Sequence, residues 1–340
     1  MEYSSVVGLV LAAGKGTRMK SDIPKVLHEV FFSPMIHHVL DTLEPIFLGK
    51  NIVVTGHQHQ LVEQALRGYS ISFVHQPQQL GTGHAVLACE NELRLHKGPV
   101  LILCGDTPLI RTETLREFLR IHVESASKLT VMTTSVGEPA NYGRIVSDAN
   151  GNIVKIVEEK DATPEEKEIS EINAGIYCVD AQFLLGALHR VGTDNMQGEV
   201  YLTDIVAIAT GDGVHVHKFI CRDSEEVLGV NSRRELAHAH SVLQRRYLTV
   251  LMESGVTLIQ PETITVQKSV TIGKDSQIHP NTSLTGGCTI GSGVRIDSFV
   301  KIDECTIGDC VHVCSFSYLQ QANIPSWSTV APYTMDVKML

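Results

Sequence analysis

The stretch that decides the fold is VVGLVLAAGKGTRM at residues 6–19, followed by Pro-Lys at 24 and 25. Its first six residues, Val6–Leu11, are apolar with little alternation, which predicts a buried strand. The strand runs directly into a turn of small residues, where backbone amides can approach an anion and nearby cations add charge. The glycines and cations of this turn are Gly14, Gly16, Lys15, Arg18 and Lys25.

This glycine loop (residues 13–19) differs from two common phosphate-binding loops. A dinucleotide-binding turn needs a third glycine where this chain has Met19, and a P-loop needs a lysine after its second glycine, whereas Lys15 precedes Gly16. The remaining alternative is an ordinary tight turn, but such turns rarely carry Gly-Lys-Gly-Thr-Arg and then Pro-Lys. The loop therefore predicts an anion site of a third kind.

Composition limits the classes of protein to which the chain can belong. Its 340 residues suffice for about two domains, and its net charge of −10 argues against nonspecific binding to nucleic acid or to a membrane surface. No apolar run approaches the roughly 20 residues that a membrane span needs, and residues 1–13 lack the basic start of a secretory signal. We therefore expect a cytoplasmic protein.

The eight cysteines lie scattered along the chain, mostly in apolar stretches, which favours reduced thiols over a disulfide framework. Cys305, Cys310 and Cys314 are close in sequence but contain no C-x-x-C pair. A zinc site built from these three cysteines is therefore not expected.

Residues 1–110 alternate apolar strands with helical patterns, which predicts a doubly wound, mostly parallel sheet of the Rossmann-like α/β class. Ligands of such sheets bind beyond the carboxyl ends of the strands. The glycine loop, the polar segment 75–85 (the glutamine loop) and Asp106 all follow predicted strands, so we expect them to converge on one crevice. The predicted strands of this region are 6–11, 51–55, 71–74 and 99–104.

Local signals predict several further elements. Ser33-Pro34 is expected to open a helix as N-cap and N1. Asn150-Gly151 predicts a hairpin with a type I′ turn, and the segment 197–204 is expected to start a helix. One long helix is predicted from Asn231 to about Glu253, bridging two domains, with Asn231 as its candidate cap. A single helix is expected over 85–93.

From Val270 onward, aliphatic residues recur every six positions, and the register slips once at Ile307. This period fits a short, left-handed parallel β-helix of hexapeptide repeats, with roughly three coils whose flat sides pack against copies of the chain. We therefore expect a domain at 1–229, a linking helix at 230–255 and a truncated β-helix at 256–340. The aliphatic ladder is Ile272, Ile278, Leu284, Ile290, Ile296, Ile302, Ile307, Val313 and Leu319.

The ordered motifs resemble those of the sugar-1-phosphate nucleotidyltransferases, and among them the bacterial N-acetylglucosamine-1-phosphate uridyltransferases, which are usually joined to a glucosamine-1-phosphate acetyltransferase. The resemblance covers essentially the whole chain. Besides the glycine loop, it rests on QPQQLGTGHA (76–85), GDTPLI (105–110), NYGRIV (141–146), IVEEKDAT (156–163), EINAGI (171–176), QGEVYLTD (197–204) and GVNSR (229–233).

The resemblance implies a role for each matching residue. Catalytic roles fall to Arg18 and Lys25, which would bind the UTP phosphates, and metal binding to Asp106 and Asn231, which would hold Mg²⁺. The nucleotide would be bound by Leu11, Ala12, Ala13, Gly14, Lys25, Gln76, Gly81, Thr82, Gly105 and Asp106. The amino sugar would be bound by Gly143, Glu158 and Asn173. Cys104 departs from the family pattern, because this position can be a tyrosine.

The implied reaction converts UTP and N-acetylglucosamine 1-phosphate into UDP-N-acetylglucosamine and pyrophosphate, with Mg²⁺ and without a covalent intermediate. The flat sides of the short β-helix predict a homotrimer, and a separate acetyltransferase is a further candidate partner. We expect no acetyltransferase activity, because the family's acetyl-CoA-binding residues have no counterpart positions here. Two alternatives stay open: a nucleotidyltransferase for another sugar 1-phosphate, and a catalytically degenerate trimeric scaffold.

Overall fold

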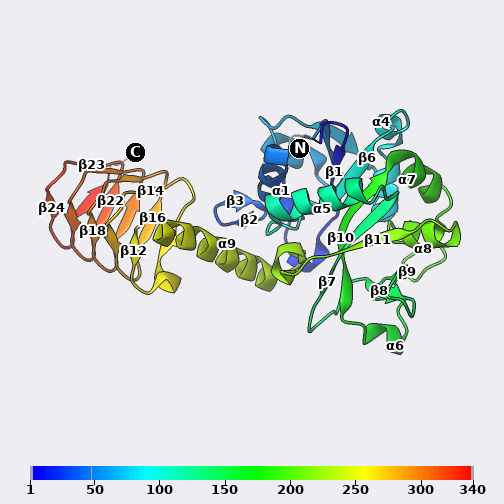
Figure 1. Cartoon of the computed structure of the whole chain (residues 1–340). Coiled ribbons are helices and arrows are strands. Elements are labelled where there is room, and N and C mark those ends of the chain that lie inside the picture. The colour runs from blue at the N-terminus through cyan, green and yellow to red at the C-terminus, as the bar shows by residue number, and fades with distance from the viewer. Residues whose placement is uncertain (1–2, 47, 338–340) are drawn as a thin grey trace. The chain divides into compact units, whose positions relative to one another are not determined.

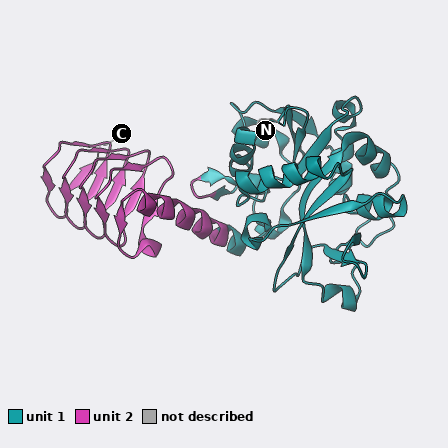
Figure 2. Cartoon of the chain, in the orientation of Figure 1, with its two compact units in different colours: residues 1–29, 33–236 teal, residues 30–32, 237–340 magenta. Residues whose placement is uncertain are grey.

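The structure is a computed structural model that describes residues 3–46 and 48–337. It divides into two compact units, one of residues 1–29 and 33–236 and the other of residues 30–32 and 237–340 (Figure 2). Each unit has its own core. Within the described residues, no helix combines the length and apolarity that crossing a membrane requires.

The first unit is built on a nine-stranded mixed sheet (Figure 1). Its main path runs β11-β7-β10-β6-β1-β4-β5, and β8 and β9 extend it as a hairpin beside β10. The strands β6, β1, β4 and β5 are parallel, whereas β10 is antiparallel to both β6 and β7. The strands are β1 (Val7–Ala12), β4 (Lys50–Thr55), β5 (Ser72–His75), β6 (Pro99–Cys104), β7 (Leu129–Ser135), β8 (Arg144–Ser147), β9 (Ile153–Val157), β10 (Glu171–Asp180) and β11 (Val216–Ile220).

Helices cover both faces of this sheet, as a doubly wound fold requires. Successive residues of β1 point to opposite faces, so Leu9 joins one buried cluster and Val10 the other. The α-helices of the described residues are α1 (Met35–Leu43), α2 (His59–Ala65), α3 (Thr82–Leu87), α4 (Glu90–Leu93), α5 (Thr112–Glu124), α6 (Pro164–Lys167), α7 (Ala181–Leu188), α8 (Asp204–Gly211) and α9 (Arg233–Glu253). The 3₁₀ turns are η1 (Thr17–Met19), η2 (Lys25–Leu27), η3 (Glu44–Ile46), η4 (Ser224–Val227) and η5 (Pro261–Thr263).

Three predictions made from local signals were wrong in detail. Ser33 and Pro34 form strand β3, which pairs with β2 (Glu29–Val30), so α1 begins only at Met35. The helix predicted over 85–93 is two short helices, α3 and α4. The segment 197–204 is not helical until Asp204, where α8 begins.

The 144–157 hairpin exists, but its turn is not of type I′. Type I′ needs positive φ at both central residues, and of the pair Asn150-Gly151 only Gly151 has it, at 82°. The amide of Asp148 donates to Asn152 O, so the loop has three residues. The Asp148 carboxylate also accepts hydrogen bonds from the amides of Asn150 and Asn152. A turn capped by Asp148 therefore replaces the expected two-residue turn.

The second unit contains most of α9 and a parallel β-helix, which agrees with the hexapeptide period. Three parallel sheets of five, five and four strands stack the aliphatic ladder inward, with Ile278, Ile296 and Val313 in one inward column. The repeat begins at Thr257, so the coil is longer than the three turns expected from Val270. The strands are β12 (Thr257–Leu258), β13 (Thr265–Val266), β14 (Thr271–Ile272), β15 (Gln277–Ile278), β16 (Ser283–Thr285), β17 (Thr289–Ile290), β18 (Arg295–Ile296), β19 (Lys301–Asp303), β20 (Thr306–Ile307), β21 (His312–Val313), β22 (Tyr318–Gln320), β23 (Asn323–Ile324), β24 (Thr329–Val330) and β25 (Met335–Val337).

The inward ladder should dominate the stability of the β-helix. Ile290 is 3% exposed, whereas its neighbour Thr289 is exposed. We expect Ile290→Ala to lower the free energy of unfolding of this unit by about 2–5 kcal/mol, because it leaves a cavity between coils. Thr289→Ala, the matched outward change, should cost less than about 0.5 kcal/mol in the same denaturant titration. Equal effects of the two changes would contradict an inward-facing ladder.

Candidate active site at the carboxyl edge of the sheet

A cavity of about 720 Å³ lies at the carboxyl ends of β1 and β6. The glycine loop, the glutamine loop and Asp106 all line it, as the topology of a doubly wound sheet predicts. Of the predicted nucleotide-binding residues, those that line it are Leu11, Ala12, Ala13, Gly14, Lys25, Gln76, Gly81, Thr82 and Asp106. Gly105 lies just behind the wall, where its amide donates to Leu11 O at 2.9 Å and ties the end of β6 to β1.

The glycine loop presents free backbone donors to this cavity. Within the described residues, no hydrogen bond is made by the amides of Gly14, Lys15 and Gly16. Gly16 adopts a left-handed conformation with φ of 61°, and a Cβ there would lie 2.5 Å from the Lys25 Cβ. At Gly14, by contrast, a Cβ would meet no protein atom within 4 Å. Packing therefore explains the glycine at 16, whereas Gly14 faces open space beside free amides, as an anion site requires.

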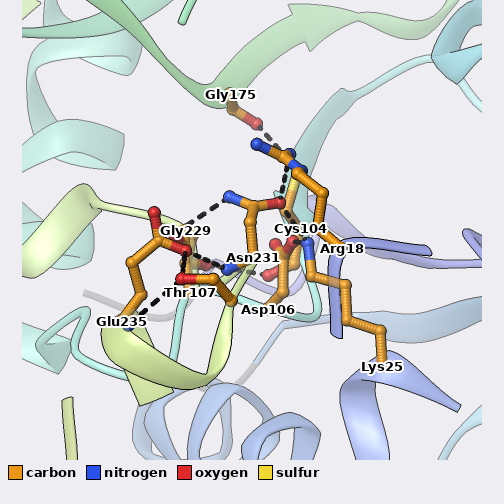
Figure 3. Close-up of polar contacts among 10 residues, drawn as sticks. Arg18, Lys25, Cys104, Asp106, Thr107, Gly175, Gly229, Asn231 and Glu235 are labelled. Atoms are coloured by element: carbon orange, nitrogen blue, oxygen red, sulfur yellow. Dashed lines mark hydrogen bonds and ion pairs between the residues drawn. The ribbon is translucent and has the colours of Figure 1, made fainter. Parts of the chain in front are cut away.

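Figure 3 shows Arg18, Lys25, Asp106 and Asn231 together in one polar cluster. Lys25 and Asp106 line the cavity, whereas Arg18 and Asn231 do not. The ammonium of Lys25 contacts the Asp106 carboxylate and also donates to Asn231 Oδ1 at 2.6 Å. The guanidinium of Arg18 donates to the same Asn231 oxygen at 2.8 Å. Residues that are 213 positions apart in sequence thus meet at one point, and both predicted metal ligands lie in this cluster.

The start of α9 holds Asn231 in place. Ser232 Oγ accepts from the Glu235 amide, and the Glu235 carboxylate accepts from the Asn231 amide and from Ser232 Oγ. Ser232 is therefore the helix cap. Asn231 lies one residue earlier, so the expectation that it caps the helix was wrong. Its Nδ2 donates to Gly229 O at 3.1 Å, which turns its amide oxygen toward Arg18 and Lys25.

The glutamine loop places a buried amide at another part of the cavity. Gln76 is 2% exposed, and its Nε2 donates to His84 Nδ1 at 2.8 Å and to Gly81 O at 3.3 Å. Thr82 Oγ1 accepts from the Leu202 amide at 3.0 Å, which holds the segment 197–204 against this loop. Sequence reasoning missed the supporting role of His84, although the residue stands inside the QPQQLGTGHA motif.

The three predicted sugar-binding residues lie together but do not line the 720 Å³ cavity. A Cβ added to Gly143 would lie 3.7 Å from both Asn173 Cβ and Glu158 Oε2. The Asn173 amide donates to Gly143 O at 2.9 Å, and its side chain donates to the buried Tyr177 hydroxyl at 2.7 Å. The group is linked to the cavity through Cys104, which lines it and which lies close enough to Glu158 for that carboxylate to raise its pKa.

Cys104 is a half-buried thiol and is not a reactive one. Burial, followed by the nearby Asp106 carboxylate, raises its pKa to about 12. Its Sγ faces Gly175 O at 3.8 Å. A thiol that stays protonated at neutral pH is a poor nucleophile, so the arrangement does not suit covalent catalysis through this cysteine.

The site shifts the pKa of the Glu158 carboxyl group. Desolvation raises its pKa, and a hydrogen bond from Thr203 Oγ1 at 3.0 Å opposes that shift. A carboxyl with a raised folded-state pKa binds protons more tightly in the folded chain, so its charged form costs stability above the unfolded pKa. We expect Glu158→Gln to raise the melting temperature at pH 7 by a few degrees and to leave it nearly unchanged at pH 4. A gain that is larger at pH 4 than at pH 7 would contradict this assignment.

Comparison with known proteins identifies both parts of the chain. Residues 8–169 match the family model of the MobA-like NTP transferase domain, and residues 269–304 match six repeats of the bacterial transferase hexapeptide. A solved structure from Bacillus anthracis, assigned as a glucose-1-phosphate thymidylyltransferase in complex with sucrose, superposes with a TM-score of 0.57. It covers 70% of this chain and 94% of its own at 21% identity, so this likeness shows the fold alone.

Curated relatives extend the likeness to nearly the full chain. The bifunctional protein GlmU of Desulfotalea psychrophila is 46% identical over 311 residues, which are 92% of each chain. The bifunctional protein GlmU of Pelobacter propionicus is 42% identical over 329 residues, which are 96% of this chain and 72% of that one. Together with the nucleotidyltransferase fold and its cavity, these relatives show that the chain belongs to the GlmU family and is a sugar-1-phosphate nucleotidyltransferase.

Proposed function

We propose that this enzyme transfers the uridylyl group of UTP to N-acetyl-α-D-glucosamine 1-phosphate, giving UDP-N-acetylglucosamine and pyrophosphate in a Mg²⁺-dependent reaction. The observation that carries the proposal is a cavity lined by free loop amides, Lys25 and Asp106, with Arg18 and Asn231 hydrogen-bonded beside them. We place the activity in the cytoplasm, because all eight cysteines are free thiols.

The chemistry needs charge neutralisation more than proton transfer. A sugar-phosphate oxygen is already anionic at neutral pH, and it attacks the α-phosphorus of UTP while the bond to the pyrophosphate oxygen breaks. No proton has to move, so no general base is required. Arg18, Lys25 and the amides of the glycine loop would hold the triphosphate in line and stabilise the charge that develops on it.

Asp106 and Asn231 fit a divalent cation. The Lys25 ammonium touches an oxygen of each, so the two oxygens already converge on one cationic position. One carboxylate and one amide oxygen form the kind of partial, hard-oxygen donor set that Mg²⁺ accepts while it keeps several waters. When bound, the cation would neutralise phosphate charge.

Gln76 favours a nucleotide base that has a ring N–H donor, such as the N3–H of uracil. Both hydrogens of its amide are used by His84 and Gly81, and its Oε1 accepts no hydrogen bond within residues 3–46 and 48–337. A fixed acceptor can pair with the N3–H of uracil, whereas cytosine presents an acceptor at that position. We therefore infer that the glutamine loop selects uracil over cytosine.

A substrate panel tests the proposal. The assay measures Mg²⁺-dependent pyrophosphate release. It pairs each of the four ribonucleoside triphosphates, and dTTP, with N-acetylglucosamine 1-phosphate or glucose 1-phosphate. UTP with N-acetylglucosamine 1-phosphate should be the best pair. Preference for another pair would favour the first alternative, a different nucleotidyltransferase, and no turnover with any pair would favour the trimeric scaffold.

We further propose that the chain is a homotrimer without acetyltransferase activity, and that a separate acetyltransferase is a candidate partner. The hexapeptide repeats support a trimer. Two cations of the described β-helix are already engaged, because Arg295 is paired with Asp297 and Lys301 lies 4.8 Å from the centre of the Tyr318 ring. Light scattering should give a trimer, and acetyl-CoA with glucosamine 1-phosphate should release no free thiol. A monomer, or thiol release at enzyme-like rates, would contradict this proposal.

A further inference from the structure

Three side chains of types that can coordinate a metal ion lie together on one outward face of the β-helix, in the second unit. His312 begins β21 and Cys314 follows two residues later, so both side chains leave the same face of the strand. Asp297 follows β18, which pairs with β21, and its amide donates to Val313 O at 2.9 Å. The inward positions between them are Ile296 and Val313, which are fully buried.

The ligand atoms of these three residues all lie within 4.8 Å of one another. Asp297 Oδ2 and His312 Nε2 are 2.9 Å apart, and all three residues are half-buried. In the part of the chain that the structure describes, this is the only group of three or more His, Cys, Asp or Glu side chains that converge in this way. The juxtaposition depends on the coil, which brings residues 15 and 17 positions apart onto neighbouring strands.

This geometry differs from that of a nucleophilic cysteine. In a cysteine–histidine–acid triad, the acid and the thiol lie on opposite sides of the imidazole, so that the acid orients a ring that takes the proton from the thiol. Here the Asp297 carboxylate and the Cys314 thiol lie within 4.8 Å of each other as well as of the ring. Three donors that face one point form a coordination site rather than a relay.

We propose that Asp297, His312 and Cys314 bind one Zn²⁺ ion. One thiolate, one imidazole and one carboxylate form a mixed donor set that zinc accepts, whereas Mg²⁺ prefers oxygen ligands alone. Tetrahedral zinc places its ligand atoms about 3.3–3.7 Å apart, so small side-chain rotations suffice to close the site. Water completes the fourth position. The ion joins the coil that carries β18 to the coil that carries β21, a structural role distinct from the uridylyl transfer proposed above.

Arg295 supports the site from its edge. Its Nε donates to Asp297 Oδ1 at 2.9 Å, which leaves Oδ2 directed at His312. A ligating carboxylate is commonly oriented by such an outer hydrogen bond. The preceding strand adds a further imidazole on this face, because His279 donates its amide to Ile296 O and so stands beside Asp297. Its Nε2 is buried and has no hydrogen-bond partner within the described residues.

The test uses the full chain, reduced and freed of metal, in excess Mg²⁺ so that the Asp106 region is occupied by the hard cation. Zn²⁺ is titrated against a chromophoric chelator, and Co²⁺ replaces it as a spectroscopic probe. We expect one Zn²⁺ per chain, a thiolate-to-cobalt charge-transfer band, and a higher melting temperature with zinc. Cys314→Ser should abolish the band and weaken zinc binding by about a hundredfold or more.

Cys310→Ser is the matched control, because Cys310 is another half-buried free thiol of the same β-helix and lies outside the cluster. It should keep both the band and the zinc affinity of the unmodified chain. His312→Gln is a second variant for the case that Cys314→Ser folds poorly. It should weaken zinc binding and shift the cobalt–thiolate band. Binding of less than one Zn²⁺ per chain, a band that survives Cys314→Ser, or a band lost in Cys310→Ser would overturn the proposal.

Discussion

Replacing Lys25 with alanine is expected to lower kcat/KM for uridylyl transfer by about a thousandfold while secondary structure and oligomeric state stay unchanged. The Lys25 side chain is 12% exposed and lines the cavity, and its ammonium contacts Asp106 and Asn231. In such a desolvated site, a cation stabilises developing phosphate charge far more than a cation in water does. Pyrophosphate release under subsaturating substrate measures the loss.

Lys20→Ala is the control for this prediction. Lys20 follows η1 directly after the glycine loop, is exposed, and does not line the cavity. Its removal changes the net charge by the same amount as Lys25→Ala, so a general electrostatic effect on UTP binding would appear in both variants. We expect Lys20→Ala to change kcat/KM less than threefold. Similar losses in the two variants would refute a specific role for Lys25.

The strands, the β-helix and the position of the cavity could be predicted from sequence, because they follow from the spacing of apolar residues and from the topology of a parallel sheet. An apolar run such as Val6–Leu11 is typical of a buried strand, and the structure places β1 there, shifted by one residue. The six-residue ladder has one structural solution, a parallel coil, because neither a helix nor a flat sheet buries every sixth side chain. The convergence of the glycine loop, the glutamine loop and Asp106 follows from parallel strands ending at one edge.

Side-chain partnerships between distant segments could not be predicted in this way. Asn231 Oδ1 meets Arg18 only because the start of α9 returns to the glycine loop, and no local pattern encodes that return. The support of Gln76 by His84 depends on the tight turn at Gly81, where φ is 109° and a Cβ would lie 2.4 Å from Val200 O. The resemblance to a family supplied these residues as a set, but not their contacts.

Local turn signals failed where tertiary pairing competed with them. Ser33-Pro34 is a good helix start on its own, but its pairing with β2 keeps Pro34 extended, with ψ at 142°. Cys314 shows the same limit for metal sites. A C-x-x-C pair supplies its ligands from one loop, whereas a β-helix brings together residues from successive coils.

Asp106→Asn tests whether a divalent cation, in addition to protein cations, neutralises the charge of the phosphates. The change keeps the shape of the side chain and removes one anionic oxygen donor. We expect kcat to fall by about a thousandfold and the Mg²⁺ concentration for half-maximal activity to rise tenfold or more, because a neutral amide is a weaker ligand than a carboxylate. Asp22→Asn, at an exposed carboxylate of the neighbouring loop outside the cavity, should leave both quantities within twofold.

The two variants should change the Mg²⁺ requirement differently. Asp106→Asn should raise it, whereas Lys25→Ala should not. The Lys25 ammonium contacts both oxygens that would bind the cation, so it competes with a metal for them unless it turns toward phosphate. Lys25→Ala removes that competitor, and its residual activity should need no more Mg²⁺ than the unmodified enzyme needs. Asp106→Asn removes a ligand and should need more. If both variants raised the Mg²⁺ requirement equally, Asp106 and Lys25 would act together on the nucleotide, and the metal site would have to lie elsewhere.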